Sequence, residues 1–327
     1  MGQVNVRPQA ALALDVGGTK LAAAVVVVGG DGPQVRCRVQ VPTETDRGAA
    51  HVMERMERAA ARALADYRAT ESAVPVEACG ASALGCPDAA GERVAFGANL
   101  MEGWTGMPVA ARLSHAVGVP CVLLGDVQAH ALGEARWGAA AGAPSCLCVA
   151  PGTGLGGGLV IDGRLVRGAH GLAGHLGHMQ SVHAQGMRCS CGTLGHIEAV
   201  TSGVGIGALY QGVDVASADF DPAIDGAWVA RRAARGDARA RAVLARSGFA
   251  LGSEIGSWAN LVDPAVIVIG GSVRKAGAVW REALERGFRS QALEPLRDVP
   301  LVDAALGDDA ALVGAAEYAL DRFARPA

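Results

Sequence analysis

Two histidines and two cysteines near the middle of the sequence are residue types that bind zinc. His178, Cys189, Cys191 and His196 supply two nitrogen and two sulfur atoms, a complete ligand set for one tetrahedral zinc ion. The Cys-x-Cys spacing brings two thiolates together, and the neighbouring glycines permit the tight turns that fold another ligand back. We interpret the four residues as a structural zinc site, and the alternative is a set of solvated loop residues.

The same loop carries His175 and Glu198, so a bound zinc ion would fix their position as well. The ligand spacing is not that of a two-knuckle zinc finger, and no basic recognition helix follows it. We therefore expect the zinc to support a site formed with other parts of the chain.

A first strand–turn–strand pattern covers residues 11–28, which read ALALDVGGTKLAAAVVVV. The turn exposes backbone N–H groups, and Gly17 and Gly18 lack the side chains that would keep a phosphate away. Thr19 adds a hydroxyl donor, and Asp15, at the end of a buried strand, is placed to hold Mg²⁺ through water. An ordinary hairpin turn is the alternative.

A second pattern of the same kind covers residues 145–163, SCLCVAPGTGLGGGLVIDG. Gly152, Gly154 and Gly157 satisfy the G-x-G-x-x-G fingerprint of dinucleotide sites, but a strand follows them where that site needs a helix. We therefore reject a dinucleotide fold. The repeat of strand, Gly/Thr turn and strand indicates a duplicated architecture in which each lobe offers one phosphate-binding hairpin.

An aspartate follows the apolar run at residues 119–124, VPCVLL. Asp126 lies at the carboxyl end of this predicted strand, where open α/β sheets bind ligands, and a predicted helix at residues 127–137 comes next. An N-cap role is the simpler interpretation and a catalytic base the more specific one. One aspartate can do both.

Four further patterns complete the chain. The run VIVIGG at residues 266–271 repeats strand into glycines, a turn that could pass under an adenine or ribose. Asn99 stands in a polar loop, where a ligand contact and a turn explain it equally well. Helical spacing covers residues 201–210 and 227–261. No linker divides the chain.

The bulk properties exclude several classes of protein. The chain has 327 residues, enough for two lobes, and half of them are hydrophobic with a formal net charge of −3. This balance implies neither a nucleic-acid patch nor a membrane surface. No apolar run reaches the roughly 18 residues of a membrane helix. Eight cysteines without a signal peptide lead us to expect a reduced, cytoplasmic protein.

The segments ALDVGGTK, GTGLGGGLVIDGRLVRGAHGLAGHLGH, CSCGTLGHIE and VIVIGGS together resemble the ROK family (repressors, open reading frames, kinases) over nearly the whole chain. The resemblance implies the α/β, actin-like (ribonuclease H-like) fold of sugar kinases, with two lobes closing over ATP and a hexose. We expect residues 1–134 plus 312–327 to form the N-terminal lobe and residues 135–311 the C-terminal lobe, which carries the zinc loop.

The resemblance also assigns roles to residues. It implies that Asp126 is the base that removes a proton from the sugar 6-hydroxyl. The residues expected to bind ATP and its Mg²⁺ are Asp15, Gly17, Gly18, Thr19, Lys20, Gly152, Thr153, Gly154, Gly270 and Gly271. Those expected at the sugar are Asn99, Asp126, His175, His178 and Glu198. Relatives are usually dimers, so we expect a homodimer.

Three positions depart from the family pattern. His196 replaces the family's third cysteine, Gly125 replaces the usual asparagine before the catalytic aspartate, and His175 stands where the family's glucokinases carry glutamate. In this last position, His175, the chain resembles bacterial N-acetylmannosamine kinases. The resemblance favours N-acetylmannosamine over glucose as the substrate. A glucokinase is the alternative of the same class. A non-catalytic sugar-sensing regulator is the alternative of another class, although only about ten residues precede the first strand here.

Overall fold

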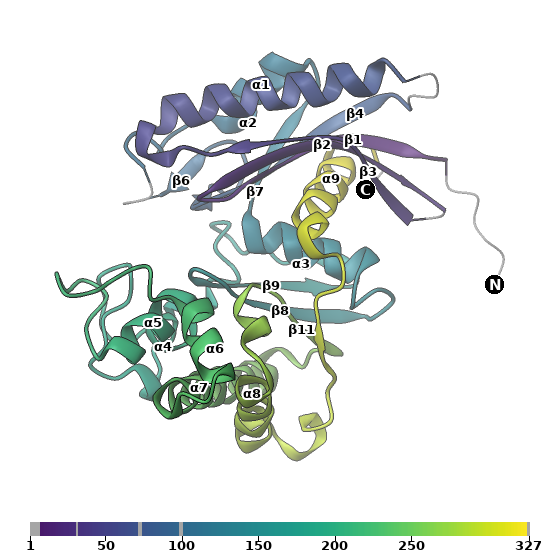
Figure 1. Ribbon diagram of the computed structural model, residues 1–327. Helices are drawn as coiled ribbons and strands as arrows, with labels where there is room; N and C mark the ends of the chain where they lie inside the picture. Colours follow the sequence, from purple (N-terminus) through teal and green to yellow (C-terminus); the bar gives the residue numbers. More distant parts are fainter. Residues whose placement is uncertain (1–6, 31, 71–73, 98–100, 326–327) are drawn as a thin grey trace. The chain divides into compact units, whose positions relative to one another are not determined.

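The computed structural model describes residues 7–30, 32–70, 74–97 and 101–325 of the chain (Figure 1). The chain divides into two compact units. The first comprises Met1–Gly142, Gly158–Ala173 and Ala305–Ala327, and the second comprises Ala143–Gly157 and Gly174–Ala304. The lobe boundaries expected from the sequence stay a prediction, because compactness alone does not locate the joint between two lobes.

A five-stranded sheet forms the centre of the first unit. Its strands are β1 (Gln9–Val16), β2 (Lys20–Gly29), β3 (Gly32–Pro42), β4 (Val76–Ala83) and β7 (Cys121–Gly125). Their order across the sheet is β3-β2-β1-β4-β7, antiparallel from β3 to β1 and parallel from β1 to β7. β5 (Cys86–Pro87) and β6 (Val94–Phe96) form a small separate sheet.

The alternation of Leu and Ala in β1 decides which helices cover each face of this sheet. The helices of the unit are α1 (Ala49–Arg68), α2 (Val109–Val117), α3 (Asp126–Trp137) and α9 (Ala310–Phe323). Leu12 and Leu14 belong to the core shared with α1 and α2, whereas Ala11 and Ala13 belong to the core shared with α9 (Figure 1). Successive strand residues point to opposite faces, so the small residues let α9 approach closely.

The second unit is built around another five-stranded sheet. Its strands are β8 (Ser145–Pro151), β9 (Leu155–Ile161), β10 (Arg164–Leu165), β11 (Val266–Ile269) and β12 (Leu301–Asp303), in the order β10-β9-β8-β11-β12. β9 begins in this unit, and its last residues and β10 belong to the first. The helices are α4 (Glu198–Thr201), α5 (Gly203–Gln211), α6 (Gly226–Ala234), α7 (Ala238–Val262) and α8 (Ala278–Gln291). Among the helices of the described ranges, none is long and apolar enough to cross a membrane.

Short 3₁₀ turns link these elements in both units. They are Thr45–Arg47, Leu176–His178, Val182–Ala184, Val273–Ala276, Glu294–Leu296 and Gly307–Asp309. Two of them, Leu176–His178 and Val182–Ala184, lie in the loop between β10 and α4 that carries the predicted zinc ligands. That loop has little regular structure of its own, so its shape depends on turns and on side-chain contacts.

The prediction of one helix over residues 227–261 is wrong, because the structure has two helices there. α6 ends at Ala234, and Gly236 adopts a φ of +91°, which no helix residue can hold. The carboxylate of Asp237 then accepts the backbone N–H of Ala240 at 3.0 Å and begins α7 as its N-cap.

Glycines set the distance between α3 and α9. A Cβ atom added to Gly314 would lie 1.8 Å from the carbonyl oxygen of Ala129, and one added to Gly133 would lie 2.2 Å from that of Ala310. The two helix backbones therefore touch directly. Because Asp126 is the first residue of α3, this contact also fixes the axis on which that side chain is carried.

A buried carboxylate anchors the other end of α3. Glu134 is fully buried, and its oxygens accept the backbone N–H groups of Ala139 at 2.8 Å, Ala305 at 2.9 Å and Leu306 at 2.8 Å. Three N–H donors compensate for the loss of water around the carboxylate. Glu134 thus holds the segment that leads out of α3 and the segment at which the chain returns to this unit.

We predict that Gly314→Ala lowers the midpoint temperature of thermal unfolding by several degrees, since overpacking of this kind costs about 1–3 kcal/mol. Differential scanning calorimetry measures the shift. Gly30→Ala is the matched control, because a methyl there meets no atom within 4 Å in the described part of the chain. A Gly314→Ala protein as stable as the Gly30→Ala protein would contradict direct backbone contact between α3 and α9.

Candidate functional site

The first glycine turn is a tight connection between β1 and β2. The backbone N–H of Gly17 donates to the carbonyl of Lys20 at 3.0 Å, and the hydroxyl of Thr43 donates to the carbonyl of Gly17 at 2.7 Å. Gly18 and Thr19 are exposed at its tip. Lys20, predicted to lie near ATP, forms an ion pair of 2.8 Å with Asp308. The turn thus presents exposed backbone that an anion can approach.

Asp15 lies beside this turn, near the end of β1. Burial raises the pKa of its carboxyl group from the ordinary value, while a hydrogen bond from Ser82 and the charge of Lys20 act in the opposite direction. The hydroxyl of Ser82, directly opposite on β4, donates to Asp15 Oδ1 at 2.7 Å. A carboxylate in such surroundings is stabilised by a nearby cation, so the position suits a water-mediated Mg²⁺ contact. Ser82 was not predicted from the sequence.

Asp126 occupies the position that the sequence indicates. β7 ends at Gly125 and α3 begins at Asp126, with Gly125 rather than Asp126 in the N-cap position. The Asp126 side chain is exposed, and its Oδ1 accepts the backbone N–H of Val127 at 2.8 Å. An exposed carboxylate is accessible to a substrate hydroxyl, which a general base must reach.

The second unit brings the second glycine turn and the third strand-into-glycine pattern together. The N–H of Gly270 donates to the carbonyl of Val149 at 2.8 Å, and Gly271 has a φ of +66°. A Cβ atom on Gly271 would lie 2.1 Å from the carbonyl oxygen of Pro151, immediately before Gly152. The two predicted nucleotide-binding segments of this unit are therefore neighbours. Only glycine fits at position 271.

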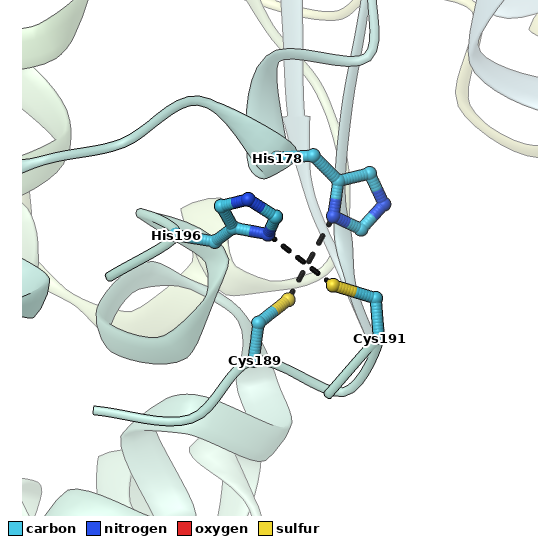
Figure 2. A group of neighbouring side chains, drawn as sticks. All are labelled: His178, Cys189, Cys191 and His196. Atoms are coloured by element: carbon cyan, nitrogen blue, oxygen red, sulfur yellow. Dashed lines mark hydrogen bonds between the residues drawn. The ribbon is translucent and has the colours of Figure 1, made fainter. Parts of the chain in front are cut away.

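The four predicted zinc ligands form one cluster. Their ligand atoms all lie within 4.8 Å of one another, and the side chains point toward a common centre (Figure 2). Cys189 Sγ lies 3.7 Å from His178 Nδ1, and Cys191 Sγ lies 3.2 Å from His196 Nδ1. Zinc–ligand bonds of about 2.0 to 2.3 Å in a tetrahedron put the donor atoms about 3.3 to 3.8 Å apart. The two separations above are close to this range, and small side-chain movements would bring the whole set, now within 4.8 Å, around one zinc ion.

The two thiols of this cluster differ in acidity. Burial raises the pKa of Cys189 to about 12. Desolvation acts to raise the pKa of Cys191 as well, but hydrogen bonds from the backbone and side chain of Thr193 and from Cys189 lower it overall. Burial and the neighbouring His178 lower the pKa of His196. Cys189 and His196 are thus neutral at pH 7 without metal, and a metal ion must displace the Cys189 proton.

Glu198 joins this cluster to the second glycine turn. Its buried carboxylate accepts the backbone N–H of Leu155 at 2.8 Å through Oε2 and the hydroxyl of Ser190 at 2.5 Å through Oε1. The Cys189 thiol donates to the same Oε1 at 3.4 Å. A Cβ atom on Gly154 would lie 2.7 Å from Oε2, so any side chain there would displace this carboxylate. Ser190 was not predicted from the sequence, although its place between two predicted ligands was a usable signal.

The remaining predicted sugar residues are placed as follows. The rings of His175 and His178 stack with their centroids 6.4 Å apart, so both belong to the same part of the Cys/His loop. Asn99 lies outside the described residues. The first unit therefore carries Asp15, the turn before Lys20, and Asp126. The second carries both further glycine segments, the histidines and Glu198.

The chain is similar to characterised proteins along nearly its whole length. The model of the ROK family matches residues 11–322. A glucokinase of Halalkalibacterium halodurans is 30% identical over 310 residues, covering 92% of each chain. An N-acetylmannosamine kinase of Yersinia pseudotuberculosis is 33% identical over 311 residues, covering 94% of this chain and 97% of the relative.

A solved structure gives the same result for the fold. The ROK family glucokinase of Streptomyces griseus, in complex with glucose and AMPPNP, is 30% identical with a TM-score of 0.75, covering 95% of this chain and 99% of that one. The likeness confirms the actin-like α/β fold that the sequence motifs imply.

Proposed function

Since the chain belongs to the ROK family, we propose that it is an ATP-dependent kinase for the 6-hydroxyl of a hexose or N-acylhexosamine, most readily N-acetylmannosamine. The observation that carries the proposal is the exposed Asp126 carboxylate at the start of α3, at the carboxyl end of a parallel strand. A carboxylate there can accept the proton of a sugar hydroxyl.

Phosphoryl transfer depends on positioning and charge neutralisation more than on covalent chemistry. In this proposal the backbone N–H groups of the turns at residues 17–19 and 152–154 hold the ATP phosphates, and Gly270–Gly271 contact the nucleoside. Mg²⁺ bound with ATP would neutralise phosphate charge, and Asp15 would hold it through water. The buried position of Asp15, which disfavours an unpaired negative charge, supports this role.

Asp126 acts on the sugar in this proposal. Its carboxylate orients the sugar hydroxyl and accepts its proton as the sugar oxygen bonds to the γ-phosphorus of ATP. The bond from that phosphorus to the bridging oxygen breaks at the same time, and ADP leaves. His175, His178 and Glu198 also contact the sugar in this proposal. The carboxylate of Glu198 keeps acceptor capacity for a sugar hydroxyl, since each carboxylate oxygen has two lone pairs.

The Cys/His cluster holds a structural zinc ion in this proposal. His178, Cys189, Cys191 and His196 fill all four positions of a tetrahedral site, so none remains open for substrate. The zinc ion would fix the loop that carries His178 and leads to Glu198. Its role is therefore indirect, through the position of groups that contact the sugar.

The choice of sugar rests on His175. Both an N-acetylmannosamine kinase and a glucokinase are among the relatives, so overall identity does not decide between them. The imidazole at position 175 replaces the glutamate that glucokinases of the family carry. An imidazole near the sugar suits an N-acetyl group better than a second carboxylate beside Glu198 does. Glucose phosphorylation is the second candidate, favoured by the Halalkalibacterium relative.

A coupled assay of ADP release tests the proposed activity and its sugar. We expect kcat/KM to be highest for N-acetylmannosamine among N-acetylmannosamine, glucose, N-acetylglucosamine and mannose. The variant His175→Glu is expected to shift the preference toward glucose. A wild-type preference for glucose would refute the sugar assignment alone. No sugar-dependent ADP release with any of the four would refute the kinase proposal.

Asp126→Asn should lower kcat by about 10²- to 10⁴-fold, because the amide cannot accept the hydroxyl proton. Sugar affinity, measured by isothermal titration calorimetry, should stay within about threefold of the wild type, since the side chain keeps its size and polarity. Asp298→Asn removes one exposed carboxylate of the second unit and should leave kcat unchanged. A near-normal rate in Asp126→Asn would exclude this residue as the base.

Protein purified without chelators is expected to contain about one zinc per chain by atomic emission spectrometry. Cys191→Ser should reduce the content, whereas Cys37→Ser, outside the cluster, should not. Zinc affinity should rise with pH, because the raised pKa of Cys189 means that binding releases a proton. Removal of the metal should weaken sugar binding. Zinc-free protein of full sugar affinity would rule out the supporting role.

A further inference from the structure

A short segment of the first unit, residues 168–173, is held by side chains that the proposed site does not use. We call it the strap. It follows β10 and ends where the chain enters the second unit, two residues before His175. It is closed on itself by a hydrogen bond of 3.0 Å from the N–H of Ala173 to the carbonyl of Arg167. The strap has no helix or strand of its own, so its position depends on its neighbours.

One of these neighbours is Gln128, the third residue of α3. The side chain is buried, with 4% of its surface exposed, and its Nε2 donates to the carbonyl of Gly171 at 3.0 Å and to that of Ala173 at 2.9 Å. Its Oε1 accepts the backbone N–H of Gly125 at 3.4 Å. The amide nitrogen of Gln128 thus donates to the strap, while its amide oxygen accepts from the residue before Asp126. Few side chains can do both, because this requires a donor and an acceptor at one end.

The other neighbour is Arg167, the residue immediately before the strap. Its guanidinium donates to the carbonyl of Asp88 and to that of Ala89, each at 2.9 Å. Gly171 approaches the same region, since a Cβ atom there would lie 2.8 Å from the carbonyl oxygen of Pro87, and its φ is +79°. The strap is therefore fixed on one side to the residues after β5 and on the other to the start of α3.

We infer that Gln128 is a positioning residue for sugar binding, which holds the strap in register with Asp126 before the sugar arrives. The inference rests on the proposed function, because the strap leads into His175 and α3 carries the proposed base. A protein whose binding-competent arrangement is only partly populated binds with an affinity reduced by that fraction. Loss of the Gln128 contacts should therefore raise the KM for sugar. It should leave the rate at saturating sugar nearly unchanged.

Gln128→Glu tests this with little change in size. The carboxylate can still accept the N–H of Gly125, but its second oxygen faces two carbonyl oxygens to which it cannot donate. We expect the KM for sugar to rise about tenfold or more, from the loss of two buried hydrogen bonds. We expect kcat to stay within about threefold and the KM for ATP to stay unchanged. A structural defect alone would not produce this split.

Gln211→Glu is the matched control. Gln211, in α5 of the second unit, also donates to backbone carbonyls, those of Gly207 and Asp221, and accepts a backbone N–H, that of Asp221. Gln211 is more exposed than Gln128, so the same chemical change there should cost less thermal stability, and it should leave the KM for sugar unchanged. An equal rise in the KM for sugar in both variants would overturn the inference. It would also be overturned if the KM for sugar of Gln128→Glu did not rise, or if only the kcat of that variant fell.

Arg167→Lys provides a second test should Gln128→Glu not fold. A single ammonium group cannot replace the guanidinium at both carbonyls, so the KM for sugar should rise in the same direction with kcat retained. An unchanged sugar KM in Arg167→Lys would overturn the inference in that case. The Asp126→Asn variant distinguishes failure of the proposed function from failure of the role inferred for Gln128. A fully active Asp126→Asn protein refutes the proposed base, whereas an inactive one beside a Gln128→Glu protein that matches its control refutes only the role of Gln128.

Discussion

The buried carboxylate of Glu198 is the interaction on which the candidate site of the second unit depends. A carboxylate removed from water must be compensated by hydrogen-bond donors or a cation, and here Leu155 and Ser190 supply the donors. Leu155 belongs to the strand after the second glycine turn, and Ser190 lies between the two cysteines of the cluster. Neither segment can shift without leaving the charge uncompensated. The second glycine turn and the Cys/His loop are therefore held in a fixed position relative to each other.

Buried polar side chains perform the same task in the first unit. Glu134 holds the segments at the end of α3 and around Ala305, and Gln128 holds the strap against the start of the same helix. Each side chain bonds to main-chain groups that lie far from it in sequence. Such contacts cost conformational entropy to form but then fix backbone position closely. A phosphoryl-transfer enzyme needs this kind of fixed geometry, because positioning supplies much of its catalysis.

The sequence predicted the parts of this molecule that are encoded locally. The alternation in ALALDV, the glycine turns and the strand-to-helix junction at Asp126 all follow from patterns a few residues long. The break between α6 and α7 was missed because the apolar spacing continues across it. Ser82 and Gln128 were missed for another reason: their partners lie 67 and 43 residues away, so no local spacing reveals them. Only the fold brings such groups together.

The substitution of histidine at position 196 has an electrostatic consequence for Glu198. With zinc bound as proposed, two thiolates balance the charge of the ion, and two neutral imidazoles complete a site of zero net charge. A third thiolate would give the site a charge of −1. The Glu198 carboxylate lies only 3.4 Å from Cys189 Sγ, so that extra negative charge would repel it at close range. With His196 in place of a cysteine, the proposed zinc site would therefore add no net negative charge beside Glu198.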